Sequence, residues 1–444
     1  MRKSLKWMNL ALAGALTLSL AACGSSSKEE DNKGTEAGTE TTPKAENVTI
    51  TFQNIYPDPE TPSYKIMKQI VDQYQKDHTN VKIELDSLNT DQQKLKLKTQ
   101  AASKEVPDIT IVNPAAQMKP FVDAGLFAPL NDMLDKDGLK DTFQEGILDF
   151  YSFDNNVYAL PDGNNVAVVF YNKKLFADAG ITKTPTTFEE LLADVKTLKD
   201  KKITPMVIGE KDTWTGSFLF MNTLLRTNGG PGFLKDVVDG KKTFNDPGFE
   251  SAVANFEKLV QAGAFQDGAT SMDYNAGENL FKTGKSAMYF MGTWATGAID
   301  ASEVGPDVGV FQFPTVEGKG DPNEYMLAPG SAFAISANSK HLAETKDFLH
   351  YFMSQYPKVS FDMKNAVSIA QKVDGDFKAA GYSNLQMEVA ALKGNVKGGD
   401  LSFDNTMNPS TSQVHLTSIQ NLFVQQVDPK AVAQEHQTAF ESNK

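Results

Sequence analysis

Apolar positions along the chain follow two spacings, one typical of strands and one typical of helices. Residues 48–52 (VTITF) and 81–85 (VKIEL) alternate apolar and polar side chains, which predicts strands. Between them, Thr61 and Pro62 are a preferred N-cap and a preferred first helical residue. Apolar side chains follow at helical spacing, at Ile66, Met67, Ile70, Val71 and Tyr74. The pattern predicts a strand, a helix and a second strand.

The same alternation continues beyond residue 90. We expect a helix over roughly residues 90–104, followed by a strand over 108–112 (DITIV). The unbroken apolar run of this strand is typical of a strand buried in a parallel sheet. A β-α-β-α-β order predicts a parallel sheet with right-handed crossovers.

A second series of strands and helices follows residues 158–163 (YALPDG). We expect strands over 166–171, 203–208, 286–291 and 324–336. We expect helices over 188–200, opened by a capping box of Thr187 and Glu190, and from Asp246 and Pro247 to Gly263. The sequence therefore predicts an α/β protein in two portions.

The N-terminus has the features of a secretory signal. Arg2, Lys3 and Lys6 precede an apolar stretch over residues 8–22, which ends in small residues before Cys23. The stretch is shorter than the roughly 20 apolar residues that a membrane-spanning helix needs, and no later segment offers that length. Residues 20–23 (LAAC) resemble the lipobox of bacterial lipoproteins, in which cleavage precedes a cysteine that carries a diacylglyceryl group. The alternative is a plain secretory signal whose cleavage site includes a cysteine.

Composition narrows the classes of function. Residues 23–46 form a flexible spacer rich in Ser, Thr, Gly and Glu, and the rest of the chain has the composition of a globular protein. Removal of residues 1–22 takes away three positive charges, so the formal charge falls from −13 to −16, and nucleic acid is excluded as a partner. Lipidation of Cys23, the single cysteine, leaves no thiol for a disulfide, for catalysis or for a metal.

Four blocks of sequence carry a resemblance to a known family. They are residues 106–132 (VPDITIVNPAAQMKPFVDAGLFAPLND), 157–161 with 169–192 (VYALP and VFYNKKLFADAGITKTPTTFEELL), 280–295 (LFKTGKSAMYFMGTWA) and 325–354 (YMLAPGSAFAISANSKHLAETKDFLHYFMS). In this order, they resemble the family 1 extracellular solute-binding proteins, the carbohydrate-type receptors of ABC importers. The resemblance spans nearly all of residues 48–435.

The resemblance implies a two-lobe α/β fold of the periplasmic-binding-protein type, with a ligand cleft at a hinge that the chain crosses more than once. Carried onto this sequence, the first lobe holds residues 46–160 plus 328–366. The second lobe holds residues 161–327 plus 367–444. Such clefts agree with the rule that ligands bind beyond the carboxyl ends of parallel strands and between domains.

Polar candidates for the cleft follow strand ends. Asn54, Asp58 and Glu60 come after the first strand, and their side chains can bond sugar hydroxyls. For Asn54 and Asp58 a turn or helix-cap role is an equal alternative. Asn113 follows the third strand, in a loop that the resembling proteins use for ligand. Asp162, in the YALPDG segment, completes the polar set.

Aromatic candidates lie where a sugar ring could be held. Trp214 (in KDTWTGS) and Trp294 (in MGTWATG) sit in polar, glycine-bearing segments, and an aromatic ring can cover the apolar face of a pyranose. Core packing is the alternative for both. Phe403 and Asp404 join them, because the corresponding late segment of the resembling proteins returns to the cleft edge.

Several motifs are excluded as sites. Residues 283–286 (TGKS) lack the earlier glycine of a phosphate-binding loop, and residues 134–138 (LDKDG) lack the outer ligands of a calcium loop. The five histidines show no metal spacing, and we expect them at the surface. We therefore expect no metal and no cofactor.

The resemblance implies a non-enzymatic receptor that captures a sugar, an oligosaccharide by preference, and delivers it to the transmembrane subunits of an ABC permease. We expect a monomer, held by its lipid on the outer face of the cytoplasmic membrane of a Gram-positive bacterium. A receptor for a peptide, polyamine or phosphorylated solute stays open, although Arg226 is the only arginine after the signal, which argues against strongly anionic ligands. A secreted glycosidase, which needs paired carboxyl groups, is the remaining alternative.

Overall fold

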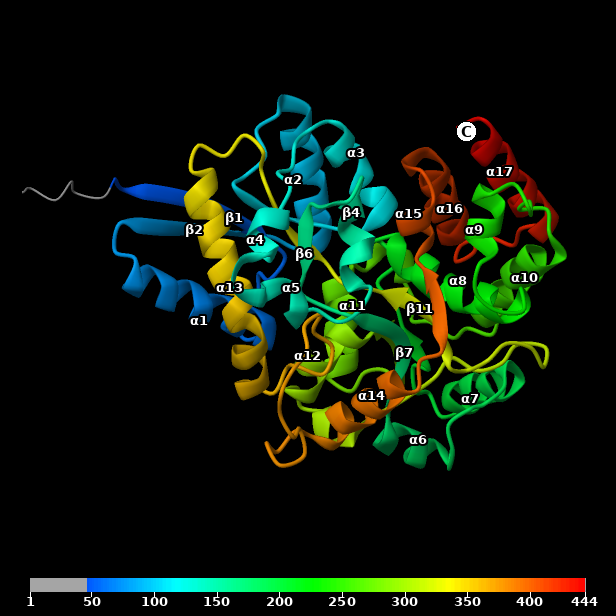
Figure 1. Ribbon diagram of the computed structural model, residues 1–444. Helices are drawn as coiled ribbons and strands as arrows, with labels where there is room; N and C mark the ends of the chain where they lie inside the picture. Colours follow the sequence, from blue (N-terminus) through cyan, green and yellow to red (C-terminus); the bar gives the residue numbers. More distant parts are fainter. Residues whose placement is uncertain (1–45, 444) are drawn as a thin grey trace, which may run out of the picture. The chain divides into compact units, whose positions relative to one another are not determined.

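The computed structural model describes residues 46–443, in which two sheets are surrounded by helices (Figure 1). The first sheet has the strand order β2-β1-β3-β12-β6. Its strands are β1 (Val48–Asn54), β2 (Val81–Ser87), β3 (Ile109–Val112), β6 (Ala159–Pro161) and β12 (Ala332–Ile335). β1 is parallel to β2 and to β3, as the β-α-β-α-β pattern predicts. β12 is antiparallel to both of its neighbours, so the sheet is mixed.

The second sheet has the order β13-β11-β7-β9-β8, and β10 also pairs with β7. Its strands are β7 (Asn165–Asn172), β8 (Met206–Val207), β9 (Met288–Gly292), β10 (Val308–Phe311), β11 (Glu324–Ala328) and β13 (Gly398–Leu401). β7 is antiparallel to β9, β10 and β11, whereas β8 is parallel to β9. A separate hairpin joins β4 (Ser152–Phe153) to β5 (Asn156–Val157).

Side chains on the central strands alternate between two cores. Along β7, Ala167 and Val169 belong to one core, and Val166, Val168 and Phe170 belong to another. In the first sheet, β12 divides in the same way. Because successive side chains of a strand point to opposite faces, both sheets are covered on both faces.

The helices whose N-caps the sequence predicts begin at the expected residues, with one difference in capping. Thr61, Thr187 and Asp246 accept hydrogen bonds at the first turns of α1, α7 and α10. Glu190 does not complete a capping box, because its carboxylate accepts from Thr186 instead of the N-cap amide. The helices are α1 (Pro62–Asp77), α2 (Thr90–Ser103), α3 (Lys119–Asp123), α4 (Asn131–Leu134), α5 (Leu139–Thr142), α6 (Lys173–Ala179), α7 (Phe188–Asp200), α8 (Trp214–Thr227), α9 (Phe233–Val238), α10 (Pro247–Gln261), α11 (Tyr274–Lys282), α12 (Thr296–Asp300), α13 (Leu342–Asp362), α14 (Asn384–Gly394), α15 (Phe403–Thr406), α16 (Pro409–Asn421) and α17 (Pro429–Glu441).

The stretch expected as one strand over residues 324–336 is two strands in different sheets. β11 ends at Ala328, and β12 begins at Ala332. Gly330 between them has a φ of 94°, a left-handed conformation that favours glycine. A Cβ on Gly330 would lie 2.9 Å from Gly163, in the connection between β6 and β7. The connection from β6 to β7 and the connection from β11 to β12 both run from one sheet to the other, and they contact each other at Gly163 and Gly330.

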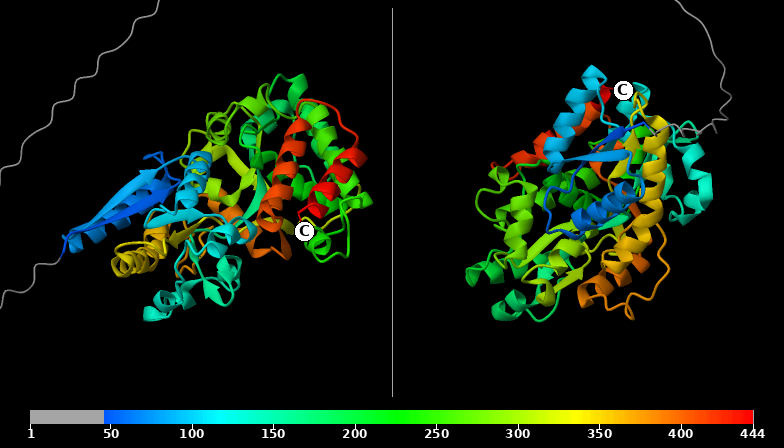
Figure 2. Two further views of the ribbon diagram at one scale, coloured as in Figure 1. Left: turned by 90° about the horizontal axis from the view of Figure 1, so that it is seen from above. Right: turned by 90° about the vertical axis from the view of Figure 1, so that its left-hand side faces the viewer.

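Helices from the end of the chain pack on the second sheet's side. Figures 1 and 2 show α16 and α17, in orange and red, beside α8 and α10, in green. His415 and His436 of these last helices are both fully buried. The expectation that all five histidines lie at the surface is therefore wrong. The two rings fill a core position as a neutral, hydrogen-bonded pair.

Candidate ligand-binding site

A cavity of about 540 Å³ is lined by segments that follow strands of both sheets. Asn113 follows β3, Asp162 follows β6, and Trp294 follows β9. Each therefore lies in a connection where the chain leaves a sheet. A cavity of this size with mixed apolar and polar walls is typical of a small-molecule site.

Aromatic side chains form one wall of the cavity. Trp214 is the first residue of α8, Tyr274 is the first residue of α11, and Trp294 lies in the 3₁₀ turn η5 (Thr293–Ala295). The ring centroid of Trp214 lies 5.4 Å from that of Tyr274 and 6.3 Å from that of Trp294. The Trp294 indole Nε1 donates to the Tyr274 hydroxyl at 3.2 Å. The three rings thus form one connected apolar surface.

Both tryptophans line the cavity and also contribute to core packing, the two roles that the sequence leaves open. Trp214 and Trp294 line the cavity and are only partly buried, while they also pack against two of the cores. Gly292 allows this position, because a Cβ there would collide with the Trp294 ring. The core thus holds each ring while part of it remains accessible from the cavity.

Asp162 lies at the crossing between the sheets and faces a group of tyrosines. The Tyr56 hydroxyl donates to Asp162 Oδ2, and the Asp162 amide donates to the Ser331 carbonyl at 3.1 Å. Burial raises the pKa of Asp162 to about 6, although the bond from Tyr56 opposes this shift. Burial and the Asp162 charge raise the pKa of Tyr56 and Tyr151 well above its usual value, so both hydroxyls stay protonated donors at neutral pH.

A second part of the cavity wall consists of polar side chains that are linked by hydrogen bonds. Asn113 Nδ2 donates to Gln117 Oε1 at 3.0 Å, and Gln117 Nε2 donates to Asp404 Oδ2 at 2.8 Å and to Asn405 Oδ1 at 2.6 Å. Ser402 donates to the other oxygen of Asp404. Asn113 and Gln117 follow β3 of the first sheet, and Asp404 lies in α15, next to β13 of the second. Hydrogen bonds therefore join segments that belong to different sheets.

The structure brings six of the nine expected ligand residues to the cavity wall. These are Asp58, Asn113, Asp162, Trp214, Trp294 and Asp404. Asp58 also has the turn role that was the alternative, because its Oδ1 accepts from the Glu60 amide at 2.9 Å.

The other three expected ligand residues lie elsewhere. Asn54 is fully buried, and its side chain accepts from the Tyr56 amide in a turn. Glu60 is exposed and forms an ion pair with Lys65. Phe403 is buried in a core and stacks on His415 with ring centroids 3.7 Å apart. Its neighbour Asp404 faces the cavity instead, because consecutive residues of a helix point in different directions.

Several cavity residues carry no sequence signal by themselves. Gln117, Tyr56 and Tyr274 are single polar or aromatic residues without a motif, and only the fold brings them together. On α11, Glu278 and Lys282 form an ion pair of 3.2 Å in the cavity wall. The spacing of four residues between Glu278 and Lys282 on a helix is a sequence signal that predicts such an ion pair.

Neither a metal cluster nor an arginine lies in the cavity wall formed by the described residues. Within residues 46–443, no group of three His, Cys, Asp or Glu side chains could hold a metal ion. Arg226 is fully buried away from the cavity and donates to the carbonyls of Glu324 and Phe313 at 2.9 and 3.0 Å. The Arg226 guanidinium therefore stabilises the fold through these backbone bonds and does not face the cavity. The same residues contain no helix with the length and apolar character needed to cross a bilayer.

Comparison with known proteins defines the family. The family model described as bacterial extracellular solute-binding protein matches residues 58–355, and the chain belongs to this family. Its members are extracellular binding components of ABC importers. The site described above, a cavity lined by segments that follow strands of both sheets, fits a protein that binds a solute.

Individual relatives cover most of the chain. A multiple sugar-binding protein of Streptococcus mutans is 26% identical, over 78% of this chain and 79% of its own length. A diacetylchitobiose binding protein of Streptomyces coelicolor is 29% identical, over 78% of this chain and 77% of its own. A structure solved in work on xylan utilization by Caldanaerobius polysaccharolyticus is 31% identical, with a TM-score of 0.81 over 88% of this chain and 99% of that one. The likeness confirms the two-lobe fold.

Proposed function

We propose that the protein captures a sugar, an oligosaccharide by preference, and delivers it to the permease of an ABC importer. The observation that carries the proposal is that Trp214 and Trp294 face the same cavity as Asp162, Asn113 and Asp404. Aromatic rings cover the apolar faces of a sugar while carboxylates and amides bond its hydroxyls. Relatives named for multiple sugars and for diacetylchitobiose support this ligand class.

Capture is proposed to work by closure of two lobes, residues 46–160 plus 328–366 and residues 161–327 plus 367–444. Sugar that touches both lobes stabilises the closed form, and the permease recognises that form. The touching crossings at Gly163 and Gly330 support a narrow hinge. Ile369, Ala370 and Tyr382 pack in the core of the first sheet, so the last crossing runs beside the first lobe before it enters the second.

The location of the protein is the second part of the proposal. The signal, residues 1–22, and the lipidation site Cys23 lie outside the described residues, so this part rests on the sequence alone. Cys23 carries a lipid anchor, and residues 23–46 space the folded body from the outer face of the cytoplasmic membrane in a Gram-positive bacterium. The receptor acts as a monomer and catalyses no reaction.

A ligand screen tests the proposal. The protein is heated with xylo-, chito- and malto-oligosaccharides, raffinose and galactose, and separately with peptides, spermidine and glycerol phosphate. A ligand that binds only the folded state raises the melting temperature in a concentration-dependent way. We expect a rise with at least one oligosaccharide, and unchanged sugar on chromatography after incubation. A rise with a peptide, polyamine or phosphorylated solute alone would replace the sugar, and hydrolysis would make the protein a glycosidase.

A further inference from the structure

A buried carboxyl group stands behind the aromatic wall of the cavity. Glu210 has no exposed surface and does not line the cavity. It lies in the connection from β8 to α8, four residues before Trp214. Its Oε2 atom bonds with the Thr215 hydroxyl at 2.7 Å and accepts from the Gly216 amide at 2.5 Å. The Glu210 side chain therefore contacts the first turn of the helix that begins with Trp214.

The start of α8 depends on this carboxyl group because it lacks an ordinary cap. Thr213, in the N-cap position, makes no side-chain capping bond. The first amides of a helix have no partner within the helix, and Glu210 supplies one for Gly216. A Cβ on Gly216 would lie 2.7 Å from both carboxyl oxygens, so only glycine permits the approach.

Burial favours the neutral form of the Glu210 carboxyl group, whose Oε2 atom accepts from both Thr215 and Gly216. Burial raises the pKa of Glu210 to about 8, the nearby charge of Asp212 adds to the shift, and the bonds from Thr215 and Gly216 oppose it. The Thr215 hydroxyl lies 2.7 Å from Glu210 Oε2 and 3.1 Å from the Gly209 carbonyl, and it is the donor towards both oxygens. The side-chain oxygen of a glutamine in this position could accept the same bonds from Thr215 and Gly216.

The backbone around Glu210 is fixed from two further sides. The Glu210 amide donates to the Ala269 carbonyl at 3.0 Å, and the Glu210 carbonyl accepts from Gln420 Nε2 of α16 at 2.7 Å. These backbone bonds hold the connection against neighbouring segments. The Glu210 side chain in turn holds the first turn of α8 against the connection.

We propose that Glu210 is a positioning residue of the sugar site, which fixes the first turn of α8 and thereby the Trp214 ring that the ligand contacts. The inference rests on the proposed function of the cavity. Glu210 itself does not touch the ligand. It acts through Thr215 and Gly216, the two residues that follow Trp214.

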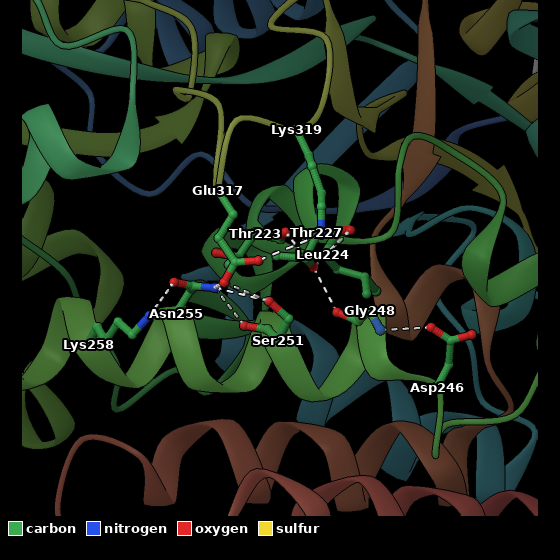
Figure 3. A network of polar contacts seen from close by, with 10 residues as sticks. All are labelled: Thr223, Leu224, Thr227, Asp246, Gly248, Ser251, Asn255, Lys258, Glu317 and Lys319. Atoms are coloured by element: carbon green, nitrogen blue, oxygen red, sulfur yellow. Dashed lines mark hydrogen bonds and ion pairs between the residues drawn. The ribbon is translucent and has the colours of Figure 1, made fainter.

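The far end of the same helix offers a matched control. Figure 3 shows Thr227, the last residue of α8, bonded to the Gly248 carbonyl of α10, within a network that includes Asn255 and Glu317. The bond from Thr227 Oγ1 is 2.8 Å long, and Thr227 is buried. Thr227→Val therefore removes a buried hydrogen bond from α8 at the end opposite to Trp214.

The experiment compares Glu210→Ala, Glu210→Gln and Thr227→Val. In a Trp294→Phe background, Trp214 is the only tryptophan within residues 46–443, so its emission and acrylamide quenching can be followed without ligand. Xylotetraose affinity is measured by calorimetry in the Trp294-containing chain. We expect Glu210→Ala to change the Trp214 signal and to weaken binding about fivefold to tenfold, as loss of a buried hydrogen-bond set does. Glu210→Gln should restore both, and Thr227→Val should lower only the melting temperature.

The two readouts separate this inference from the proposed function. An unchanged Trp214 signal in Glu210→Ala, or equal loss of affinity in Thr227→Val, would overturn the positioning role. Absence of xylotetraose binding by the unaltered chain would count against that sugar as the ligand, and the Trp214 signal alone would then decide the role of Glu210. If Glu210→Ala does not fold, Thr215→Val gives the same test, because it removes the hydroxyl between Glu210 and Gly209.

Discussion

The Gln117 side chain donates a hydrogen bond of 2.8 Å to Asp404, and the two residues belong to segments of different sheets. A second bond of 2.6 Å from the same nitrogen reaches Asn405. Both bonds lie in the wall of the cavity. If the lobes open, these hydrogen bonds are broken, so they stabilise the closed arrangement relative to the open one.

Gln117→Ala should shift that equilibrium towards the open form. Each hydrogen bond contributes about 0.5–1.5 kcal/mol net, so the loss of both should change the population of the closed form several-fold. We expect a larger radius of gyration in solution scattering without sugar, and compaction together with a saturable tryptophan fluorescence change when sugar is added. Gln73→Ala, which removes an exposed bond to Asp77, is the matched control. A fluorescence change without compaction would contradict hinge closure.

Trp294→Ala should weaken sugar binding by roughly 1–3 kcal/mol, because the ligand loses contact with a large apolar ring. Calorimetry with the sugar found in the screen measures the effect, and circular dichroism checks the fold. Phe256→Ala, at a buried residue that does not line the cavity, should lower stability without this loss of affinity. Unchanged affinity in Trp294→Ala would assign the ring to the core alone.

Gly292→Ala should reduce affinity without removing any ligand contact. The added methyl group collides with the Trp294 ring and must displace it. We expect a shifted tryptophan emission spectrum and weaker sugar binding. Gly394→Ala is a suitable control, since nothing lies within 4 Å of a Cβ there. The prediction fails if Gly292→Ala binds sugar like the unaltered chain.

Two buried histidines should make stability depend on pH. His415 Nδ1 and His436 Nε2 are 2.8 Å apart, and His415 Nε2 lies 2.9 Å from the Ser217 hydroxyl. Burial lowers the pKa of His436 to about 4 and lowers that of His415 well below its usual value. Below pH 6.5 the unfolded chain therefore binds protons that the folded chain does not. The free energy of unfolding contributed by His436 falls by up to about 1.4 kcal/mol per pH unit from pH 6.5 to about 4, and His415 contributes in the same direction.

Urea unfolding between pH 4.5 and 7.5 measures this contribution as a difference between the unaltered chain and His436→Gln. A difference is required because buried carboxyl groups such as Asp162, with a pKa of about 6, have the opposite dependence. We expect the stability advantage of the unaltered chain to shrink as the pH falls below 6.5. Parallel curves for the two proteins would show that the pair titrates normally.

Cys23→Ser should release the protein from the membrane. Lipidation needs the cysteine thiol, so the variant should appear in the medium or remain uncleaved. Membrane fractionation and the apparent mass of the product measure this. Ser25→Ala, two residues further on, is the control and should remain in the membrane fraction. A membrane-bound Cys23→Ser protein of mature size would contradict the lipid anchor.

Local patterns predicted the elements of this fold well, but not how the strands are shared between sheets. Period-two alternation located β1 and β2, and N-cap residues located α1 and α10. Residues 324–336 were misjudged because apolar spacing continues through Pro329 and Gly330, although the chain changes sheets there. At that break Gly330 packs against Gly163, and this contact joins residues far apart in the sequence.

The site shows the same limit. Trp214 and Trp294 could be found because tryptophan is rare here and both stand beside helix or strand ends. The sequence located Asp404 in the cavity wall, but it could not show that its neighbour Phe403 is a core residue. That difference depends on the helix α15, which turns the Phe403 side chain into the core. Gln117 and Tyr56 acquire their roles only from partners brought by folding, so no local signal distinguishes them from other polar residues.

The order of strands in the first sheet also governs when the protein can fold during synthesis. β12, at residues 332–335, lies between β3 and β6, so the sheet has a gap until that late strand has left the ribosome. The first sheet therefore cannot be completed until residues 161–327, which contain most strands of the second sheet, have also been made. Because domains generally fold as units, native packing of this sheet waits for a strand made more than 150 residues after β6.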